Sequence, residues 1–295
     1  SNTLTIGGPH VEYELVISVQ GSGTTTPIPG SHLYVEGSNV SVTAIPDSGW
    51  QFSHWLLNGT NVGSTNPYNL TMNANYDLAA VFTEMTSALF EDGFESGNFN
   101  AWSGISVSSG ESGTVVNSLS HHGSYSALFA SNGNGGTESA YSYVALASSS
   151  EIYTRGYFYV SRSGIVEESD RFHFMRFRAG GNDLAFAGLR RSGGVVQWNL
   201  AIRDGTSWLN AYSASNLELN RWYCIELHWV GDSTNGLGEL FVNGQLVCSI
   251  QSKNTAALGN VNQVRFGLTQ LVNCGITEVY CDCCVISEAP IGQEG

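Results

Sequence analysis

Lysine and arginine are scarce in this chain of 295 residues, which has 11 of them against 25 Asp and Glu and a formal net charge of −14. None occurs before Arg155, none follows Arg265, and Lys253 is the only lysine. A chain of this kind lacks the cationic surface that releases counterions from a phosphate backbone, so we expect no nucleic-acid partner. The clustered arginines favour a site for anionic groups or a face that meets an acidic neighbour, although acidic drift in a secreted protein would give the same pattern.

Long apolar runs and helical periodicity are also missing. No stretch reaches the roughly 18 apolar residues that a membrane-spanning helix requires. Ser1 leads directly into polar sequence without a signal peptide, which predicts a mature or trimmed chain. Only six prolines accompany 35 glycines, a balance that favours tight turns between strands over disorder.

Short runs of alternating apolar and polar residues are present instead, most clearly in residues 221–250. Asn235-Gly236 and Asn243-Gly244 separate these runs. Asn-Gly supplies the two positive-φ positions of a type I′ turn, so this stretch predicts a three-stranded antiparallel meander. Strands continue at this density from about residue 88 onward, which predicts a sandwich of two antiparallel sheets. The fold class expected for the whole chain is all-β.

Residues 11–84 predict a separate, small β domain. Three segments carry the pattern on which this prediction rests: GSGTTTP (21–27), EGSNVSVTAIPDSGWQFSHW (36–55) and MNANYDLAAVF (72–82). This region resembles the small β-repeat of many bacterial and archaeal surface proteins, and the resemblance implies a spacer or stalk without chemistry. Residues 1–10 form a polar lead, in which a strand at 4–6 would be able to join an exposed sheet edge of another subunit.

Residues 88–288 predict the larger domain. Three of its segments are informative: LFEDGFESGNFNAW (89–102), HGSYSALF (122–129) and TEVYCDCCVIS (277–287). They resemble jelly-roll carbohydrate-binding modules and laminin-G-like, concanavalin A-like sandwiches. Residues 289–295 are expected to be a C-terminal tail.

The resemblance to jelly-roll modules implies a structural Ca²⁺ site. In that family carboxylates of the first and last strands meet around the ion, and Glu91, Asp92 and Asp282 stand at those positions, with backbone carbonyls near Gly123 and Ser124 completing the shell. Alternatively these acids are solvated strand ends. The family often has a second acid where this chain has a cysteine, at position 283.

Six cysteines predict disulfide bonds and an oxidising compartment. They are Cys224, Cys248, Cys274, Cys281, Cys283 and Cys284. The last three share one strand, on which neighbours at i and i+2 lie too far apart to bridge and adjacent residues pair only under strain. If none of those three pairs with another, each must pair with one of the first three, within the chain or between chains. A thiolate metal cluster is the alternative, although C-x-C-C lacks the loop spacing of a zinc knuckle.

The middle strands contain the residues that we predict to bind a ligand. They are Arg176, Arg178, Trp198, Arg203, Trp208 and His228. Strict alternation places Arg176 and Arg178 on one face of their strand and Arg171 and His173 on the other. Arginine, histidine and tyrosine would suit a uronate lyase, in which arginine neutralises the carboxylate and histidine or tyrosine moves the proton. Arginine stacked on aromatic residues explains the same residues without function.

Signatures of other enzymes are missing. No run of alternating acids such as E-x-D-x-x-E suggests a glycoside hydrolase, and no catalytic serine or cysteine motif is evident. Three N-x-Ser/Thr sequons, at Asn39, Asn58 and Asn69, mildly favour secretion. We therefore expect a secreted, non-catalytic protein of the cell surface, structural or adhesive, which self-associates into a filament or sheath or binds other surface proteins. The alternatives are a polysaccharide-binding module and a polysaccharide lyase.

Overall fold

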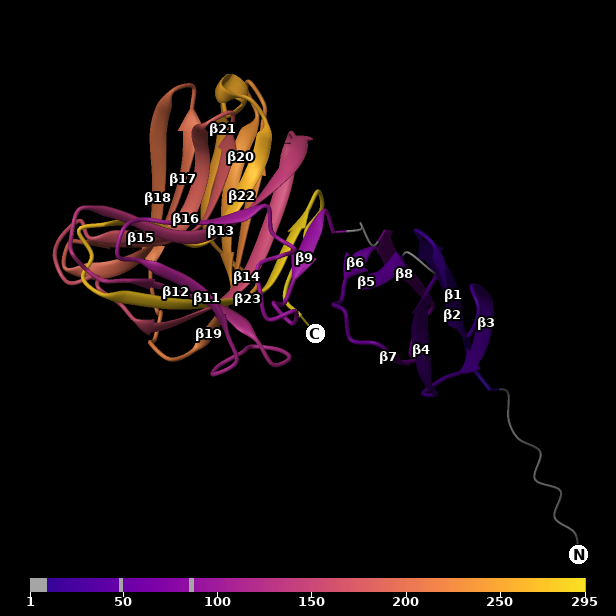
Figure 1. Cartoon of the computed structure of the whole chain (residues 1–295). Coiled ribbons are helices and arrows are strands. Elements are labelled where there is room, and N and C mark those ends of the chain that lie inside the picture. The colour runs from indigo at the N-terminus through magenta and orange to yellow at the C-terminus, as the bar shows by residue number, and fades with distance from the viewer. Residues whose placement is uncertain (1–9, 48–49, 85–87, 295) are drawn as a thin grey trace, which may run out of the picture. The chain divides into compact units, whose positions relative to one another are not determined.

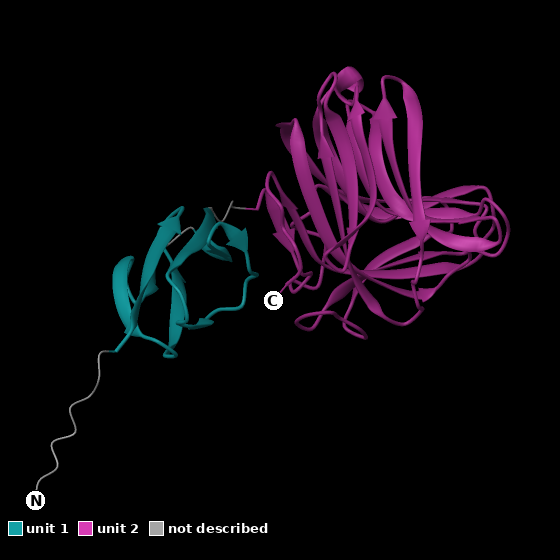
Figure 2. Ribbon diagram, turned by 180° about the vertical axis from the view of Figure 1, so that it is seen from behind, with its two compact units in different colours: residues 1–86 teal, residues 87–295 magenta. Residues whose placement is uncertain are grey.

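The computed structural model describes residues 10–47, 50–84 and 88–294. It divides the chain into two compact units, residues 1–86 and residues 87–295 (Figure 2). The regular structure of the described residues consists of strands and one short 3-10 turn, η1 (Ala256–Leu258), which confirms the all-β class. No helix in the described residues is long and apolar enough to cross a membrane. The lead strand expected at residues 4–6 lies outside the described residues.

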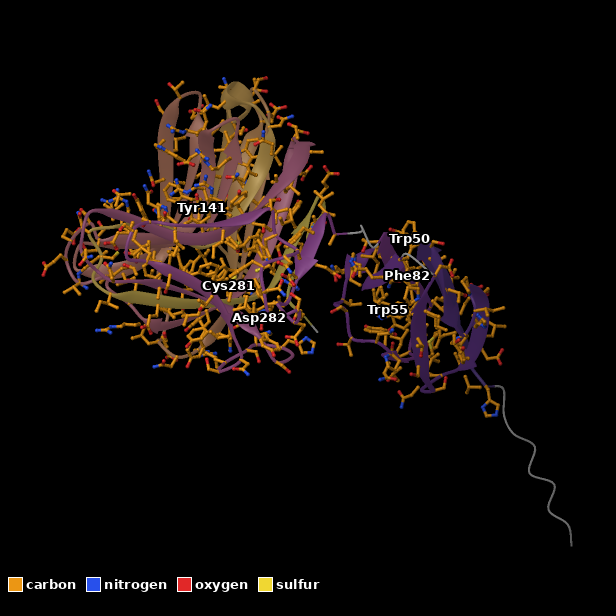
Figure 3. All side chains as sticks on the ribbon, viewed as in Figure 1. Trp50, Trp55, Phe82, Tyr141, Cys281 and Asp282 are labelled. Carbon is orange, nitrogen blue, oxygen red and sulfur yellow. The ribbon has the colours of Figure 1, made fainter. Side chains whose placement is uncertain are left out.

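The N-terminal unit contains two small sheets. The larger has the strand order β3 (Gly30–Val35), β1 (Glu12–Gln20), β8 (Tyr76–Glu84), β5 (Trp50–Leu57) and β6 (Thr60–Asn61). The smaller has the order β2 (Gly23–Thr26), β4 (Asn39–Pro46) and β7 (Tyr68–Thr71). Alternation along β1 buries Leu15 and Ile17 against Trp55, whose indole Nε1 donates to the Thr65 carbonyl (Figure 3). Trp55 is therefore a core residue.

The C-terminal unit is a sandwich of two large sheets (Figure 1). The seven-stranded sheet has the order β10 (Gly104–Val107), β13 (Thr137–Ser149), β22 (Val261–Val272), β15 (Arg171–Ala179), β16 (Asn182–Ser192), β17 (Val195–Asp204) and β18 (Ser207–Ala214). The eight-stranded sheet has the order β11 (Ser112–Val116), β12 (Ser126–Ser131), β23 (Thr277–Ser287), β14 (Glu151–Arg162), β19 (Trp222–Val230), β20 (Gly236–Val242) and β21 (Gln245–Lys253), with β9 (Phe90–Asp92) paired to β23. That makes seven strands on this path, and β9 is the eighth.

The core between the two sheets is rich in aromatic side chains. Phe158 of the eight-stranded sheet lies 5.0 Å, centroid to centroid, from Phe174 of the seven-stranded sheet. Phe266 and Trp198 are equally buried in this core. Burial of a side chain of this size stabilises a fold by about 2–3 kcal/mol. The aromatic residues of each sheet therefore determine which of its two faces turns toward the core.

The meander predicted for residues 221–250 is present as β19, β20 and β21. Asn243 and Gly244 have φ values of 48° and 73° and join β20 to β21, as the Asn-Gly pair predicted. Asn235-Gly236 does not form a two-residue turn between strands, because Gly236 is already the first residue of β20. The preceding loop is closed by Asp232, whose Oδ1 accepts the backbone N–H groups of Thr234 and Asn235.

A β-bulge in β15 determines which side chains face out of the sandwich. His173 pairs with Gly188 and Met175 pairs with Ala187, so β15 has one more residue than β16 at Phe174. Phe174 and Met175 are both completely buried in the core. The extra residue shifts the alternation, so that His173 and Arg176, three positions apart, face the same side of the sheet.

Candidate functional site

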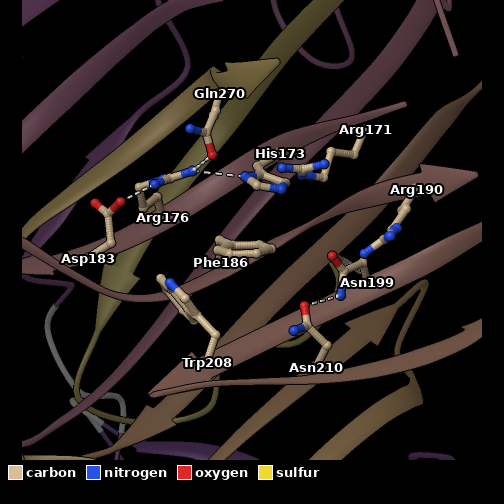
Figure 4. A pocket seen from close by; sticks show the side chains of 10 residues that line it. All are labelled: Arg171, His173, Arg176, Asp183, Phe186, Arg190, Asn199, Trp208, Asn210 and Gln270. Carbon is tan, nitrogen blue, oxygen red and sulfur yellow. Dashed lines mark hydrogen bonds and ion pairs between the residues drawn. The ribbon is translucent and has the colours of Figure 1, made fainter. Parts of the chain in front are cut away.

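A polar cleft of about 490 Å³ lies on the outer face of the seven-stranded sheet (Figure 4). Neighbouring strands β15, β16, β17, β18 and β22 supply its walls and floor. Ten side chains line it: Arg171, His173, Arg176, Asp183, Phe186, Arg190, Asn199, Trp208, Asn210 and Gln270. Three of these are arginines and one is an acid, so the cleft is locally cationic on a chain with a net charge of −14.

Arg176 connects the polar groups on the cleft floor. Its guanidinium pairs with Asp183 and its Nη2 donates to the Gln270 amide oxygen at 2.9 Å and to His173 Nδ1 at 2.8 Å (Figure 4). Asp183 also accepts from Arg178 Nε at 2.7 Å. Only 5% of the Arg176 side chain is exposed, so these partners hold a buried cation in one orientation.

His173 is neutral at the bottom of the cleft. Burial and the adjacent Arg176 charge hold the pKa of His173 well below its usual range. Because Nδ1 accepts from Arg176, the proton of the neutral ring is on Nε2. The ring stacks on Phe186 with 3.7 Å between centroids, which leaves it little freedom to turn.

Three buried nitrogens of the cleft residues have no hydrogen-bond partner among the described residues. They are His173 Nε2, Arg176 Nε and Arg190 Nε. A buried donor without a partner costs about 1–3 kcal/mol. Such a cost is typical of sites where a ligand or ordered water completes the network.

An aromatic group borders the cleft on the side of β18. The guanidinium of Arg203 lies 4.0 Å from the centroid of the Trp208 ring, and Phe186 lies 5.1 Å from the same indole. Arg203 also donates to the Asp183 and Thr206 carbonyls. Trp208 is partly exposed, and it therefore offers part of a flat apolar surface beside the charged groups.

The structure brings together only part of the predicted ligand-binding set. Arg176 and Trp208 line the cleft, and Arg178 and Arg203 adjoin it through Asp183. Two predicted residues lie elsewhere. Trp198 is 1% exposed in the core, because alternation along β17 points Asn199 outward and its neighbour inward. His228 belongs to the eight-stranded sheet, where it bonds to Glu151 and Glu239 and stacks on Tyr153.

More than half of the residues that line the cleft are not among those predicted from the sequence. Strict alternation takes no account of the bulge at Phe174, and it therefore places Arg171 and His173 on the face opposite Arg176. The residues missed are Arg171, His173, Asp183, Phe186, Arg190, Asn199, Asn210 and Gln270. The odd spacing between His173 and Arg176, with two apolar residues between them, was the available signal.

The structure has no disulfide bond within the chain. All six cysteines are thiols, five buried and Cys283 partly exposed, and bridges between chains stay a prediction. The condition that none of Cys281, Cys283 and Cys284 pairs with another considered only neighbours at i+1 and i+2, whereas the sulfurs of Cys281 and Cys284, at i and i+3, lie 3.3 Å apart. The reason is a register shift of β14 against β23, where Arg155 pairs with Val285 and Tyr157 with Asp282, and where Cys283 has a φ of 48°.

The carboxylates predicted for Ca²⁺ are engaged by nitrogen donors. Asp92 accepts from Trp102 Nε1 at 2.6 Å and from the Phe94 N–H at 3.0 Å. Asp282 accepts the backbone N–H groups of His121, His122 and Cys283. Together with Glu91 these acids form no group with ligand atoms within 4.8 Å of one another in the described chain. Oxygens already facing N–H donors do not fit the six to eight oxygens that Ca²⁺ prefers, and calcium binding stays a prediction.

The three sequon asparagines all lie in the N-terminal unit and are exposed. Asn39 accepts from Thr71 Oγ1, and Asn58 accepts from the Asp77 N–H. Asn69 is in β7. Glycosylation at these sites stays a prediction.

Comparison with known proteins separates the two units. Many solved structures are similar to the chain, among them the following two. One is the cellulose-induced protein Cip1, which is 19% identical, with 70% of this chain and 100% of that chain covered and a TM-score of 0.53. The other is an endo-β-1,4-glucuronan lyase from the fungus Trichoderma reesei, which is 12% identical, with 68% and 95% covered and a TM-score of 0.50. At these identities the likeness shows the β-sandwich fold alone.

The N-terminal unit has a sequence match of its own. No protein in the curated collection matches the chain. Residues 13–86, however, match the family model of the divergent InlB B-repeat domain. The first unit of this protein therefore has the sequence pattern of a surface-protein β-repeat, as the quoted segments predicted.

Proposed function

We propose that this chain is an extracellular surface protein whose sandwich unit binds an acidic, uronate-containing polysaccharide in the cleft of the seven-stranded sheet. The observation that carries the proposal is the convergence of Arg171, Arg176 and Arg190 on one hollow of an otherwise acidic chain. Seven of the 11 basic residues are on the strands of this sheet: Arg171, Arg176, Arg178, Arg190, Arg191, Arg203 and Arg265.

The polar groups of the cleft match the chemistry of a uronate. Guanidinium groups bind carboxylates in a bidentate manner. The amides of Asn199, Asn210 and Gln270 supply both donors and acceptors for sugar hydroxyls. Trp208 adds an apolar surface of the kind on which a sugar ring packs. The glucuronan lyase with the same fold acts, by its name, on a polymer of this class.

Calorimetric titration of the full chain tests the proposal. Oligomers of glucuronate, galacturonate and mannuronate are compared with neutral β-glucan oligomers of equal length. We expect at least one acidic series to bind, with affinity that falls as salt rises, and neutral oligomers to bind weakly or not at all. Equal binding of neutral and acidic oligomers, or no binding of any, would refute the proposal.

A matched pair of charge variants locates the site. Arg190 donates to Tyr212 at the cleft and is partly exposed. Arg221 pairs with Glu218 and lies over the Tyr223 ring on the surface away from the cleft, with 62% of its side chain exposed. We expect Arg190→Gln to weaken uronate binding about tenfold, which corresponds to roughly 1.4 kcal/mol, and Arg221→Gln to leave it unchanged.

A uronate lyase is the second candidate. The arrangement of Arg176, Gln270 and His173 favours it, because β-elimination needs a neutralised carboxylate and a group that moves a proton. His173 is neutral and is one candidate for the group that moves the proton. Tyr141 is the other, and the Arg265 guanidinium lies 4.4 Å from the centroid of the Tyr141 ring. Ultraviolet absorbance of the unsaturated uronate product over the same panel of polymers distinguishes a lyase from a binding module.

The N-terminal unit gives the proposal its cellular setting. Its match to a surface-protein repeat supports an extracellular location, with the unit acting as a spacer that presents the sandwich. Association into filaments, or adhesion to other surface proteins, stays a prediction from the sequence. Light scattering of the purified chain tests it, and a monodisperse monomer would contradict it.

A further inference from the structure

Three side chains from separate parts of the chain meet on the outer face of the eight-stranded sheet, away from the cleft. They are His121 from the loop before β12, Cys283 from the irregular part of β23 and Glu294 from the C-terminal tail. His121 Nδ1 lies 3.7 Å from Cys283 Sγ and 3.7 Å from Glu294 Oε2. All three ligand atoms lie within 4.8 Å of one another.

These separations suit a tetrahedral zinc ion. Zinc–sulfur and zinc–nitrogen bonds of about 2.3 and 2.0–2.1 Å at a tetrahedral angle place the two ligand atoms roughly 3.5 Å apart, and a nitrogen and an oxygen ligand roughly 3.3 Å apart. The observed distances therefore need to change by only a few tenths of an ångström. One thiolate, one imidazole and one carboxylate are the ligand types that zinc takes in proteins.

Surrounding residues hold the three ligands in place. Arg155 Nη2 donates to Glu294 Oε1 at 2.8 Å and Tyr157 Oη accepts the Glu294 N–H at 2.9 Å, which leaves Glu294 Oε2 directed at the histidine. The imidazole of His121 stacks on Tyr157 at 3.7 Å. Asp282 accepts the His121 N–H at 2.8 Å. Outer contacts of this kind orient metal ligands and raise affinity.

We propose that His121 Nδ1, Cys283 Sγ and a Glu294 carboxylate oxygen bind one zinc ion. The fourth position opens on a hollow of about 350 Å³ lined by Cys283 and Glu294, together with Asp92, His122 and Arg155. Zinc binding converts the Cys283 thiol to a thiolate and releases its proton to solvent. The ion ties the C-terminal tail to β23 and to the loop before β12, and an oxygen-only cation such as Ca²⁺ does not suit this ligand set.

Titration of the metal-free full chain with zinc and with cobalt tests this site. We expect one zinc ion per chain by calorimetry, and a near-ultraviolet thiolate-to-cobalt absorption band that Cys283→Ser abolishes. Glu294→Gln should weaken zinc binding at least about tenfold. That substitution also removes the charged partner of the buried Arg155, so circular dichroism of the variant checks that it is folded before zinc is added.

Two controls share chemistry with the ligands but lie outside the set. His122→Gln removes the adjacent imidazole, which lines the hollow without belonging to the group. Cys248→Ser removes a buried thiol of β21. Both variants should bind zinc as the parent does. Absence of saturable zinc binding, or zinc binding unchanged in both Cys283→Ser and Glu294→Gln, would overturn the proposal. Neither result bears on polysaccharide binding.

Discussion

The sulfurs of Cys281 and Cys284 lie 3.3 Å apart in the core of the sandwich unit, although the two residues belong to one strand. Both side chains are fully buried. The left-handed conformation of Cys283 between them turns the strand so that positions i and i+3 meet on one side.

We predict that refolding in the presence of a low-molecular-weight disulfide joins Cys281 to Cys284. Two thiols of the protein are oxidised, and the reagent is reduced to two thiols. The short ring would stabilise the fold by no more than about 2 kcal/mol. Peptide mapping by mass spectrometry checks the bond. It should disappear in Cys281→Ser and persist in Cys283→Ser, and a map dominated by links to Cys224, Cys248 or Cys274 would contradict this prediction.

Asp183→Asn should separate stability from anion binding. The change removes the carboxylate that pairs with Arg176 and Arg178, and leaving a buried guanidinium with a weaker partner should cost about 2–3 kcal/mol of unfolding free energy. The cleft simultaneously gains one unit of positive charge, so affinity for uronate oligomers at low salt should rise. Urea unfolding and calorimetric titration measure the two effects. Loss of both stability and binding would indicate that Asp183 shapes the cleft rather than balancing its charge.

Substitution of the two tryptophans of the predicted ligand-binding set should affect different properties, the core residue mainly stability and the cleft residue mainly uronate affinity. Trp198→Ala opens a cavity in the core and should cost about 3–5 kcal/mol of stability. Trp208→Ala removes a partly exposed ring that stacks with Arg203, so stability should fall by about 1 kcal/mol while uronate affinity falls several-fold. Thermal unfolding and titration of both variants test this contrast, and a larger loss of stability in Trp208→Ala would contradict the assignment.

Ionisation of Glu226 should destabilise the sandwich at neutral pH relative to a neutral analogue, and this penalty should disappear in mild acid. Burial raises the pKa of Glu226, against the opposing effects of the Gly292 and Ile291 N–H groups and Arg155. The folded state therefore holds this proton more tightly than the unfolded state. The penalty for ionisation is present above the raised pKa and is relieved as the pH falls toward the ordinary value of 4.5.

The variant Glu226→Gln supplies the comparison. Its amide oxygen is able to accept one of the two N–H groups without ionising, and the loss of the other bond is the same at every pH. We expect the free energy of unfolding of the variant, relative to that of the parent, to be highest at pH 7 and to fall as the pH is lowered to about 4.5. Urea unfolding across this range measures it. A difference that grows in acid would have the wrong sign.

Much of the fold was predictable because local patterns and tertiary packing agree. Alternation along β1 predicted the inward Leu15 and Ile17, and Asn243-Gly244 predicted the turn between β20 and β21. These are nearest-neighbour properties of the chain. The surface-protein repeat was equally predictable from the sequence, because its characteristic segments follow one another within residues 13–86.

The site was less predictable because it depends on backbone irregularities that the local pattern marks only by the odd spacing of His173 and Arg176, and on pairing between distant strands. Residues of β15 and β22 meet at Gln270 and Arg176 only after pairing of strands that are distant in sequence. The turn at Cys283 likewise brings together sulfurs that regular strand geometry keeps apart. In each case backbone geometry at one residue decides the neighbours of several side chains, and composition carries no record of it.

The bulge at Phe174 makes the outer surface of the seven-stranded sheet sensitive to the length of one strand. A regular β15 of the same sequence would direct the guanidinium of Arg176 into the hydrocarbon interior, at a cost that exceeds the whole stability of most domains. Deletion of Phe174 would instead leave His173 and Arg176 two positions apart and both facing outward, so a homologous chain keeps this surface without the bulge only if it also loses one residue of the strand.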